Sequence, residues 1–219
     1  MTQGYRFAPG ISACRPADRL ILLDLPRDRY FALTDDHDAA VSRLISGTDG
    51  DADRARLEML AAQGVLLPAA AGERPGLCPP VQAALATLAL PAGHTSPWRT
   101  ALATLAVIRA RHFLKHQGLE RAIANLRARR PAAPVGSPSD LYRIVAAFRG
   151  ASAVISPLDQ CLPRSMALAR RLFAAALAPD LVIGVAVQPF RAHCWLQSGD
   201  QLLVDDTDTV RQFTPILVL

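Results

Sequence analysis

The stretch Val182–Asp206, VIGVAVQPFRAHCWLQSGDQLLVDD, determines how the second half of this 219-residue chain folds. Its Val-, Ile- and aromatic-rich runs favour β-strands, and Ser198-Gly199-Asp200 predicts a hairpin into a further short strand. That last strand ends in two adjacent aspartates. The stretch therefore predicts neighbouring strands that carry one titratable ring, His193, close to a carboxylate.

The length of the hairpin loop decides which aspartate faces the histidine. A three-residue loop at Ser198-Gly199-Asp200 puts Asp205 opposite His193, whereas a two-residue turn at Gly199-Asp200 puts Asp206 there. Side chains directly opposed on neighbouring strands have Cβ atoms about 4.5–5.5 Å apart, so a carboxylate can hold the imidazole in one tautomer. The sequence favours Asp205 and leaves Asp206 open.

A cysteine stands at the predicted start of a helix in residues 160–172, QCLPRSMALARRL. Proline is tolerated in a first turn, so Pro163 predicts a helix that begins at Cys161 or Leu162. The free N–H groups and the positive dipole end there favour a thiolate, which makes the Cys161 sulfur a candidate nucleophile. The same amides can hold an oxyanion, and Gln160 is a candidate to support it.

Cys161, His193 and Asp205 have the residue types of a nucleophile, a general base and the carboxylate that orients the base. Each one alone is explained by an ordinary structural role: a small buried thiol, a hydrogen-bonded sheet histidine and a turn acid. Their compatible positions together favour catalysis. No spacing of cysteines or histidines predicts a metal site, and no motif predicts a bound cofactor.

Composition and charge limit the remaining function classes. The chain is 51% hydrophobic and 20% charged, which is typical of a packed globular protein. Its opening lacks the apolar segment of a secretory signal, and its apolar runs are shorter than the roughly 18 residues of a membrane span. We expect a cytoplasmic protein with free thiols and no membrane association. Nucleic-acid binding is disfavoured because residues 1–72 carry ten acids against eight arginines.

The first part of the chain predicts a small α+β domain. Residues 19–33, RLILLDLPRDRYFAL, predict a hairpin around Pro26-Arg27-Asp28. Thr34 or Asp35 is expected to start a helix that ends at Gly47, and a second helix is expected near 53–63. This order resembles a winged helix. The Pro/Gly/Ala-rich residues 68–80 predict a linker, which gives domains at 1–75 and 76–219.

Helices are predicted between this linker and Cys161, over 81–90, 98–117 and 118–130, and from Ser139 or Asp140 to Phe148. The predicted fold class is α+β. A winged-helix-like N-terminal domain precedes a domain in which helices pack on an antiparallel sheet.

The catalytic motifs resemble those of the lasso peptide B protein, a leader peptidase with a transglutaminase-like, papain-related fold. The resemblance is carried by the CL-x-RS motif, the twelve-residue gap from His193 to Asp205, and the aromatic residue two positions after the histidine. It implies that Cys161 is the nucleophile, His193 the base and Asp205 the orienting carboxylate. Cys194 and Val204 stand where relatives usually carry alanine and asparagine.

Residues 20–47 carry a second resemblance. The first 75 residues resemble the leader-recognition domain of peptide-modifying systems, similar to the chaperone of pyrroloquinoline quinone biosynthesis. In such domains the leader peptide adds as a strand to the edge of the small sheet, beside the last helix. The residues that this resemblance implies as leader contacts are Tyr30, Phe31, Arg54 and Leu57.

Together, the two resemblances imply a cysteine endopeptidase that removes the leader from a ribosomally made lasso precursor. They imply a partner as well, an ATP-using, asparagine-synthetase-like cyclase, and leave open whether cleavage needs ATP. Two alternatives remain from the residues. One is acyl transfer to an amine, as in transglutaminases, and the other is a non-catalytic leader-binding adaptor with a degenerate peptidase fold.

Overall fold

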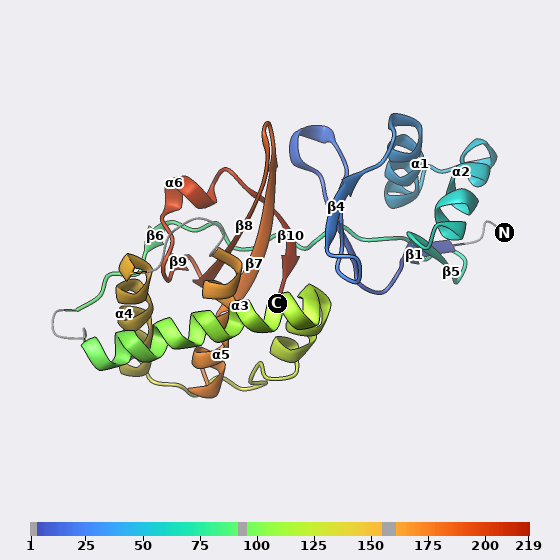
Figure 1. The fold of residues 1–219 in the computed structure, drawn as a ribbon. Coiled ribbons are helices and arrows are strands. Elements are labelled where there is room, and N and C mark those ends of the chain that lie inside the picture. The colour runs from blue at the N-terminus through green and yellow to red at the C-terminus, as the bar shows by residue number, and fades with distance from the viewer. Residues whose placement is uncertain (1–3, 92–95, 155–160) are drawn as a thin grey trace. The chain divides into compact units, whose positions relative to one another are not determined.

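The computed structural model describes residues 4–91, 96–154 and 161–219. The chain forms two compact units, residues 1–80 with 214–217, and residues 81–213 with 218–219 (Figure 1). The first division follows Pro80, a few residues beyond the boundary predicted near residue 75. Both units mix helices with strands, so the broad α+β prediction is confirmed. The likeness of the first unit to a winged helix stays a prediction.

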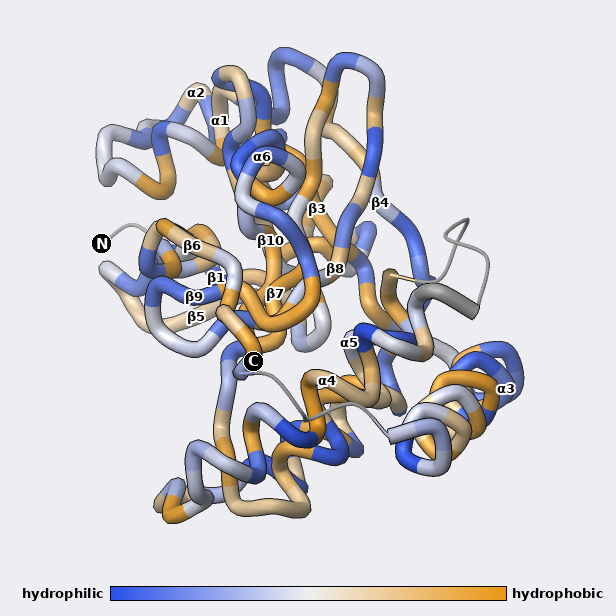
Figure 2. The backbone as a smooth tube through the Cα atoms, turned by 90° about the vertical axis from the view of Figure 1, so that its left-hand side faces the viewer, coloured by the Kyte–Doolittle hydropathy of each residue, from blue (hydrophilic) through white to orange (hydrophobic). Residues whose placement is uncertain are grey.

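A three-stranded antiparallel sheet forms the centre of the first unit. Its strands are β2 (Ile11–Cys14), β3 (Ile21–Asp24) and β4 (Arg29–Ala32), in the order β2-β3-β4, and a short 3-10 helix η1 (Pro16–Asp18) connects the first two. Strand β3 is mostly apolar (Figure 2). The predicted hairpin is confirmed, with Asp24 opposite Arg29. Strand β2 was not predicted, since its four residues carry too short a pattern to identify alone.

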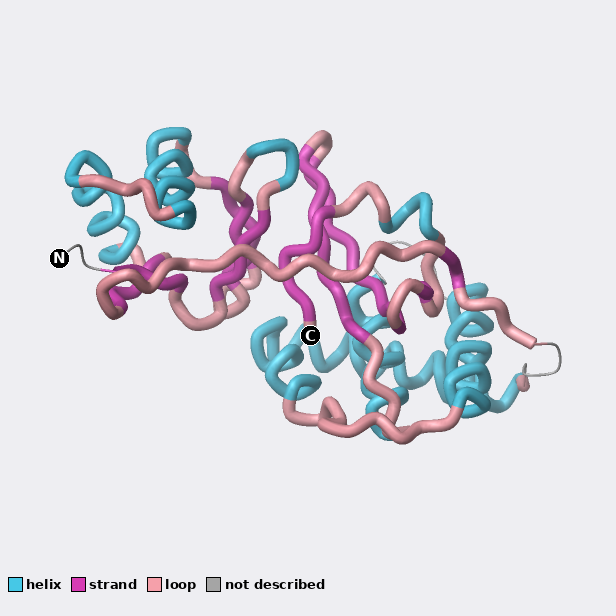
Figure 3. The backbone as a smooth tube through the Cα atoms, turned by 180° about the vertical axis from the view of Figure 1, so that it is seen from behind, coloured by secondary structure: helices cyan, strands magenta, loops and turns pink. Residues whose placement is uncertain are grey.

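Two helices follow this sheet, α1 (Asp35–Ser46) and α2 (Asp51–Ala62), both cyan in Figure 3. The first confirms the predicted start after Thr34 and the stop at Gly47, whose φ of 76° is the left-handed conformation that glycine adopts freely. Strand β5 (Leu66–Ala69) then pairs antiparallel with β1 (Gly4–Phe7). Tyr5 of β1 pairs with Pro68 of β5, so β5 extends into the segment predicted as a linker.

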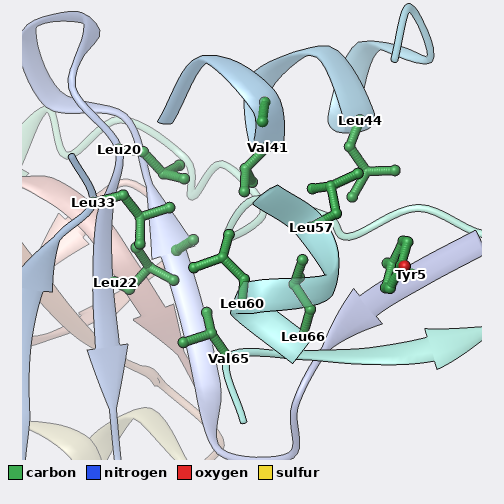
Figure 4. Packing of buried hydrophobic residues seen from close by; sticks show 12 residues of the cluster. Tyr5, Leu20, Leu22, Leu33, Val41, Leu44, Leu57, Leu60, Val65 and Leu66 are labelled. Atoms are coloured by element: carbon green, nitrogen blue, oxygen red, sulfur yellow. The ribbon is translucent and has the colours of Figure 1, made fainter. Parts of the chain in front are cut away.

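The side chains between these helices and strands form one apolar core (Figure 4). Leu22 and Leu66 are completely buried, and Leu57 and Leu60 enter the core from α2. Burial of this apolar surface is the main favourable contribution to the stability of such a small unit.

The second unit contains the sheet predicted from Val182–Asp206. Its strands β6 (Ala86–Thr87), β7 (Asp180–Val187), β8 (Phe190–Ser198) and β9 (Gln201–Leu202) belong to that unit. Strand β10 (Thr214–Val218), whose residues 214–217 are grouped with the first unit, completes the order β10-β7-β8-β9-β6. Strands β7 and β8 are antiparallel along eight residue pairs, and Gly184 lies opposite His193. Strand β6 is parallel to β9.

Three long helices accompany this sheet: α3 (Pro97–Arg127), α4 (Pro138–Val154) and α5 (Cys161–Ala174). Helix α5 contacts β7 and β8 as well as α3 and α4, so it lies between the sheet and the other helices. The two helices predicted over 98–117 and 118–130 correspond to α3, which is interrupted at Gly118 with a φ of 77°. In the described part of the chain, no helix is both long and apolar enough to cross a membrane.

The helix predicted over 81–90 is wrong. Although its alanines and leucines favour a helix, residues 86–87 form β6, and their neighbours bond to the chain near β9. The N–H groups of Leu85 and Leu88 donate to the carbonyls of Asp200 and Leu202, at 2.8 Å each. Ala84 and Leu88 are buried in this extended form, so tertiary contacts outweigh the local helix propensity.

Candidate functional site

Cys161 is the first residue of α5, as the position of Pro163 in the first turn predicts. Burial alone raises the pKa of this thiol. The hydrogen bond with His193, the charge of that residue and the backbone N–H groups of Cys194 and Leu162 together outweigh burial, so the pKa of Cys161 lies below its ordinary value of 9.0. Groups of β8 and of the start of α5 thus stabilise a thiolate at this sulfur.

The pKa values of the other three cysteines are shifted in the opposite direction. Burial raises the pKa of Cys14, of Cys78 and of Cys194 above the ordinary thiol value. All four cysteines are free. Cys161 is therefore the one cysteine of the chain, all four being described, whose surroundings favour the nucleophilic form.

His193 lies on β8 with its side chain 15% exposed, and its Nε2 is 3.1 Å from Oδ1 of Asp205. A carboxylate accepts hydrogen bonds, so Nε2 carries the proton in this contact and Nδ1 is left to face Cys161. Burial lowers the pKa of His193. The hydrogen bonds with Asp205 and Cys161, and the charges of those groups, outweigh burial and raise the pKa from 6.5 to about 9.

Two aromatic rings pack around this imidazole. Trp195 is stacked on the same strand with its ring centroid 6.1 Å away, and Phe213 lies at 5.3 Å. Gly184, opposite His193, provides the space for them. A Cβ at Gly184 would stand 2.8 Å from the Trp195 ring and 2.9 Å from Phe213, which is closer than real contacts allow. Gly184 was not predicted as part of the site, although a glycine inside an apolar strand signals a close approach of another group.

The favoured three-residue hairpin loop is wrong, and the alternative two-residue turn forms instead. Ser198 pairs with Gln201 and Gln197 with Leu202, so the loop is the two-residue turn Gly199-Asp200. If the same register continued along both strands, His193 would lie opposite Asp206. The strand ends at Leu202 instead, and the bend that follows brings Asp205 to the imidazole.

Asp206 has a different structural role. It is the N-cap of the short helix α6 (Thr207–Val210), where its Oδ1 accepts from the Thr209 N–H at 2.8 Å and its Oδ2 from the Thr209 hydroxyl. The two aspartates that the sequence left open are therefore distinguished by their partners, and Asp205 is the one that contacts His193.

A fourth charged residue, which the sequence analysis did not identify, joins this group. Arg164 donates from Nη2 to Oδ1 of Asp205 at 2.7 Å, and their side chains are 21% and 7% exposed. It lies three positions after Cys161, on the same face of α5. The available signal was the arginine of the CL-x-RS motif, but no carboxylate could be assigned to it before the tertiary structure was known.

Buried polar side chains attach α5 and the neighbouring loop to β8. The Ser165 hydroxyl donates to the Cys194 carbonyl at 2.9 Å. The indole N–H of Trp195 donates to Gln197, whose own amide donates to the carbonyls of Gln82 and Gly199. Each of these groups is satisfied within the protein, so the strand that carries His193 is held on both sides.

The remaining predicted site residues have different surroundings. Gln160 lies outside the described residues. Tyr30 and Phe31 lie on β4, and Arg54 is exposed on α2 beside Glu58 at 3.1 Å. The prediction of Leu57 as a leader contact is wrong: its side chain is 3% exposed and belongs to the apolar core of its unit (Figure 4).

A cavity of about 1130 Å³ lies between α3, α4 and α5, lined by apolar side chains such as Trp98 and Phe148 and by several arginines. Neither Cys161 nor His193 lines it. Within the residues described, no cluster of three or more histidine, cysteine or acidic side chains is arranged to hold a metal ion.

Comparison with known proteins identifies the family from the second unit. Residues 104–218, more than half of the chain, match the model of the transglutaminase-like superfamily, and this range includes Cys161, His193 and Asp205. That superfamily includes cysteine peptidases and acyltransferases. No curated protein and no solved structure matched the chain. From the family match, the chain belongs to the transglutaminase-like superfamily.

Proposed function

We propose that this chain is a cysteine peptidase that removes the leader peptide from a ribosomally synthesised precursor of the lasso type. The observation that carries the proposal is the hydrogen-bonded series from Cys161 through His193 to Asp205, in which only this thiol has a lowered pKa. Family membership supports cysteine-based acyl chemistry. The substrate class comes from the resemblance of the CL-x-RS motif and the His193-to-Asp205 spacing to lasso leader peptidases.

The reaction begins from a thiolate and an imidazolium. The Cys161 sulfur attacks the carbonyl carbon of the scissile peptide bond, and the electron pair of the C=O bond moves to oxygen. Backbone N–H groups at the start of α5 can donate to that oxyanion, and Gln160 is a further candidate donor. As the tetrahedral intermediate collapses, the carbon–nitrogen bond breaks and His193 gives its Nδ1 proton to the departing amine.

A thioester between Cys161 and the leader then remains. Neutral His193 accepts a proton from a water molecule, whose oxygen attacks the thioester carbonyl and releases the leader as a carboxylate. Asp205 stabilises the imidazolium in both steps by accepting from Nε2 and stays ionised throughout. The cycle consumes one water and restores the thiolate–imidazolium pair.

The first unit supplies leader recognition in this proposal. In the described sheet β4 pairs with β3 on one side only, so its other edge can receive an added strand. Tyr30 and Phe31 lie on that strand, and Arg54 projects from α2 into solvent. Holding the leader there raises the local concentration of the scissile bond at Cys161. The released core peptide passes to an ATP-using, asparagine-synthetase-like cyclase.

The test is mass spectrometry of a lasso precursor incubated with the wild-type protein and with Cys161→Ala. The proposal predicts two fragments whose masses add up to that of the precursor plus one water. It predicts no fragments with Cys161→Ala, although the precursor still binds. Linkage of a fragment to an added amine would favour the acyltransferase alternative. Binding without cleavage by the wild type would favour the adaptor.

A further inference from the structure

Arg164 and His193 bind the same oxygen atom. Oδ1 of Asp205 accepts from Arg164 Nη2 at 2.7 Å and from His193 Nε2 at 3.1 Å. All three side chains are at least three-quarters buried, at 21%, 15% and 7% exposure for the arginine, histidine and aspartate. The carboxylate is thus shared between a group that never loses its charge and a group that must gain and lose a proton.

The Asp205 side chain needs hydrogen-bond partners to fix its direction, because Asp205 lies outside the strands of the sheet. Strand β9 ends at Leu202, and Asp205 follows in a bend. Its main-chain carbonyl accepts from the Thr87 hydroxyl at 3.1 Å, which fixes the backbone but leaves the carboxylate free to rotate. The hydrogen bonds to Arg164 and His193 therefore set the direction of the side chain.

Arg164 is itself fixed relative to the nucleophile. It lies on the first turns of α5, three residues after Cys161, and residues at this spacing share a helix face. The next residue, Ser165, ties α5 to β8 through the Cys194 carbonyl. The arginine thus connects the helix that carries the sulfur with the bend that carries the carboxylate.

We propose that Arg164 is a positioning residue whose guanidinium holds the Asp205 carboxylate in the orientation that hydrogen-bonds His193. The proposal deepens the function proposed above, since it concerns the same site. Without Arg164 the carboxylate turns toward solvent, the imidazolium loses its stabilising charge, and the thiolate on Cys161 becomes less favoured. Cys161 is then the charged group that still raises the pKa of His193. Arg191 lies farther out, with its guanidinium 5.4 Å from the centre of the Phe213 ring that packs against the imidazole.

The test measures the thiol directly and needs no peptide substrate. Alkylation of Cys161 by iodoacetamide is followed by intact mass between pH 4 and 10 in wild type, Arg164→Gln and Asp205→Asn. We expect both variants to move the thiol titration to higher pH by about one unit, which is roughly a tenfold slower reaction in mildly acidic buffer. Arg164→Lys should restore part of the shift, because it keeps the charge but not the guanidinium geometry.

A double-mutant cycle distinguishes positioning from a general structural effect. If Arg164 acts through Asp205, Arg164→Gln changes the alkylation profile little in an Asp205→Asn background. Arg170→Gln, an exposed arginine on the same helix, is the matched control, and thermal unfolding of each variant verifies folding. An Arg164→Gln profile that overlays the wild type, or effects of the two substitutions that multiply, overturns the proposal. Failure of the wild type to cleave a precursor would instead refute the peptidase function and leave this result standing.

Discussion

His193 hydrogen-bonds Asp205 across 3.1 Å although the two residues are not paired in any strand ladder. The contact forms where β9 has ended, in the bend before α6, so it depends on the path of the chain and on Arg164. A carboxylate outside the ladder can be replaced without breaking sheet hydrogen bonds. This makes its chemical role separable from its structural one.

The two neighbouring aspartates provide a matched pair of variants. Asp205→Asn should reduce kcat for precursor cleavage by about a hundredfold or more, because the amide neither stabilises the imidazolium nor keeps the correct tautomer. Asp206→Asn should keep near-wild-type kcat, since asparagine is also a good N-cap for α6. Steady-state cleavage rates of both variants check this. A larger loss in Asp206→Asn than in Asp205→Asn would show that the wrong carboxylate was assigned.

The pKa shifts predict the pH profile of cleavage. The pKa of Cys161 lies below 9.0 and that of His193 is raised to about 9, so the thiolate–imidazolium pair exists between these values. As pH rises through about 9 the imidazolium loses the proton that the departing amine needs, and kcat/KM should fall. On the acidic side it should fall as the thiolate is protonated. An alkaline limb centred near the ordinary histidine value of 6.5 would contradict the raised pKa.

Gly184→Ala tests the packing around the imidazole. The new methyl group would collide with Trp195 and Phe213, so we expect the free energy of unfolding to drop by about 1–3 kcal/mol. Cleavage should slow as well, because both rings contact His193. Denaturant unfolding and kcat measure the two effects. Gly76→Ala, where an added Cβ meets nothing within 4 Å, is the control and should change neither.

Leader recognition by the first unit predicts competition. The isolated leader peptide, added in trans, should raise the apparent KM for the precursor and leave kcat unchanged, because it occupies the edge of β4 without reaching Cys161. A scrambled peptide of the same composition is the control. If the leader and the scrambled peptide inhibit equally, or if neither inhibits, the first unit does not recognise the leader sequence.

Features with a local cause could be predicted from the sequence. The β3–β4 hairpin follows from Pro26-Arg27-Asp28, α1 ends at a glycine in the left-handed conformation, and α5 begins at Cys161 because Pro163 fits only a first turn. Features with a non-local cause were missed. Residues 81–90 have the composition of a helix, yet their backbone groups bond to a segment more than a hundred residues away.

The sequence by itself determined the chemical groups of the site: a cysteine at a helix start, a histidine in an apolar strand and aspartates shortly after it. Only the tertiary structure decided which aspartate meets the imidazole and that Arg164 shares it. Residue types and helix starts follow from neighbours along the chain. A hydrogen bond of 3 Å between distant segments depends on where a strand stops and how the chain then bends, and packing of the whole unit sets both.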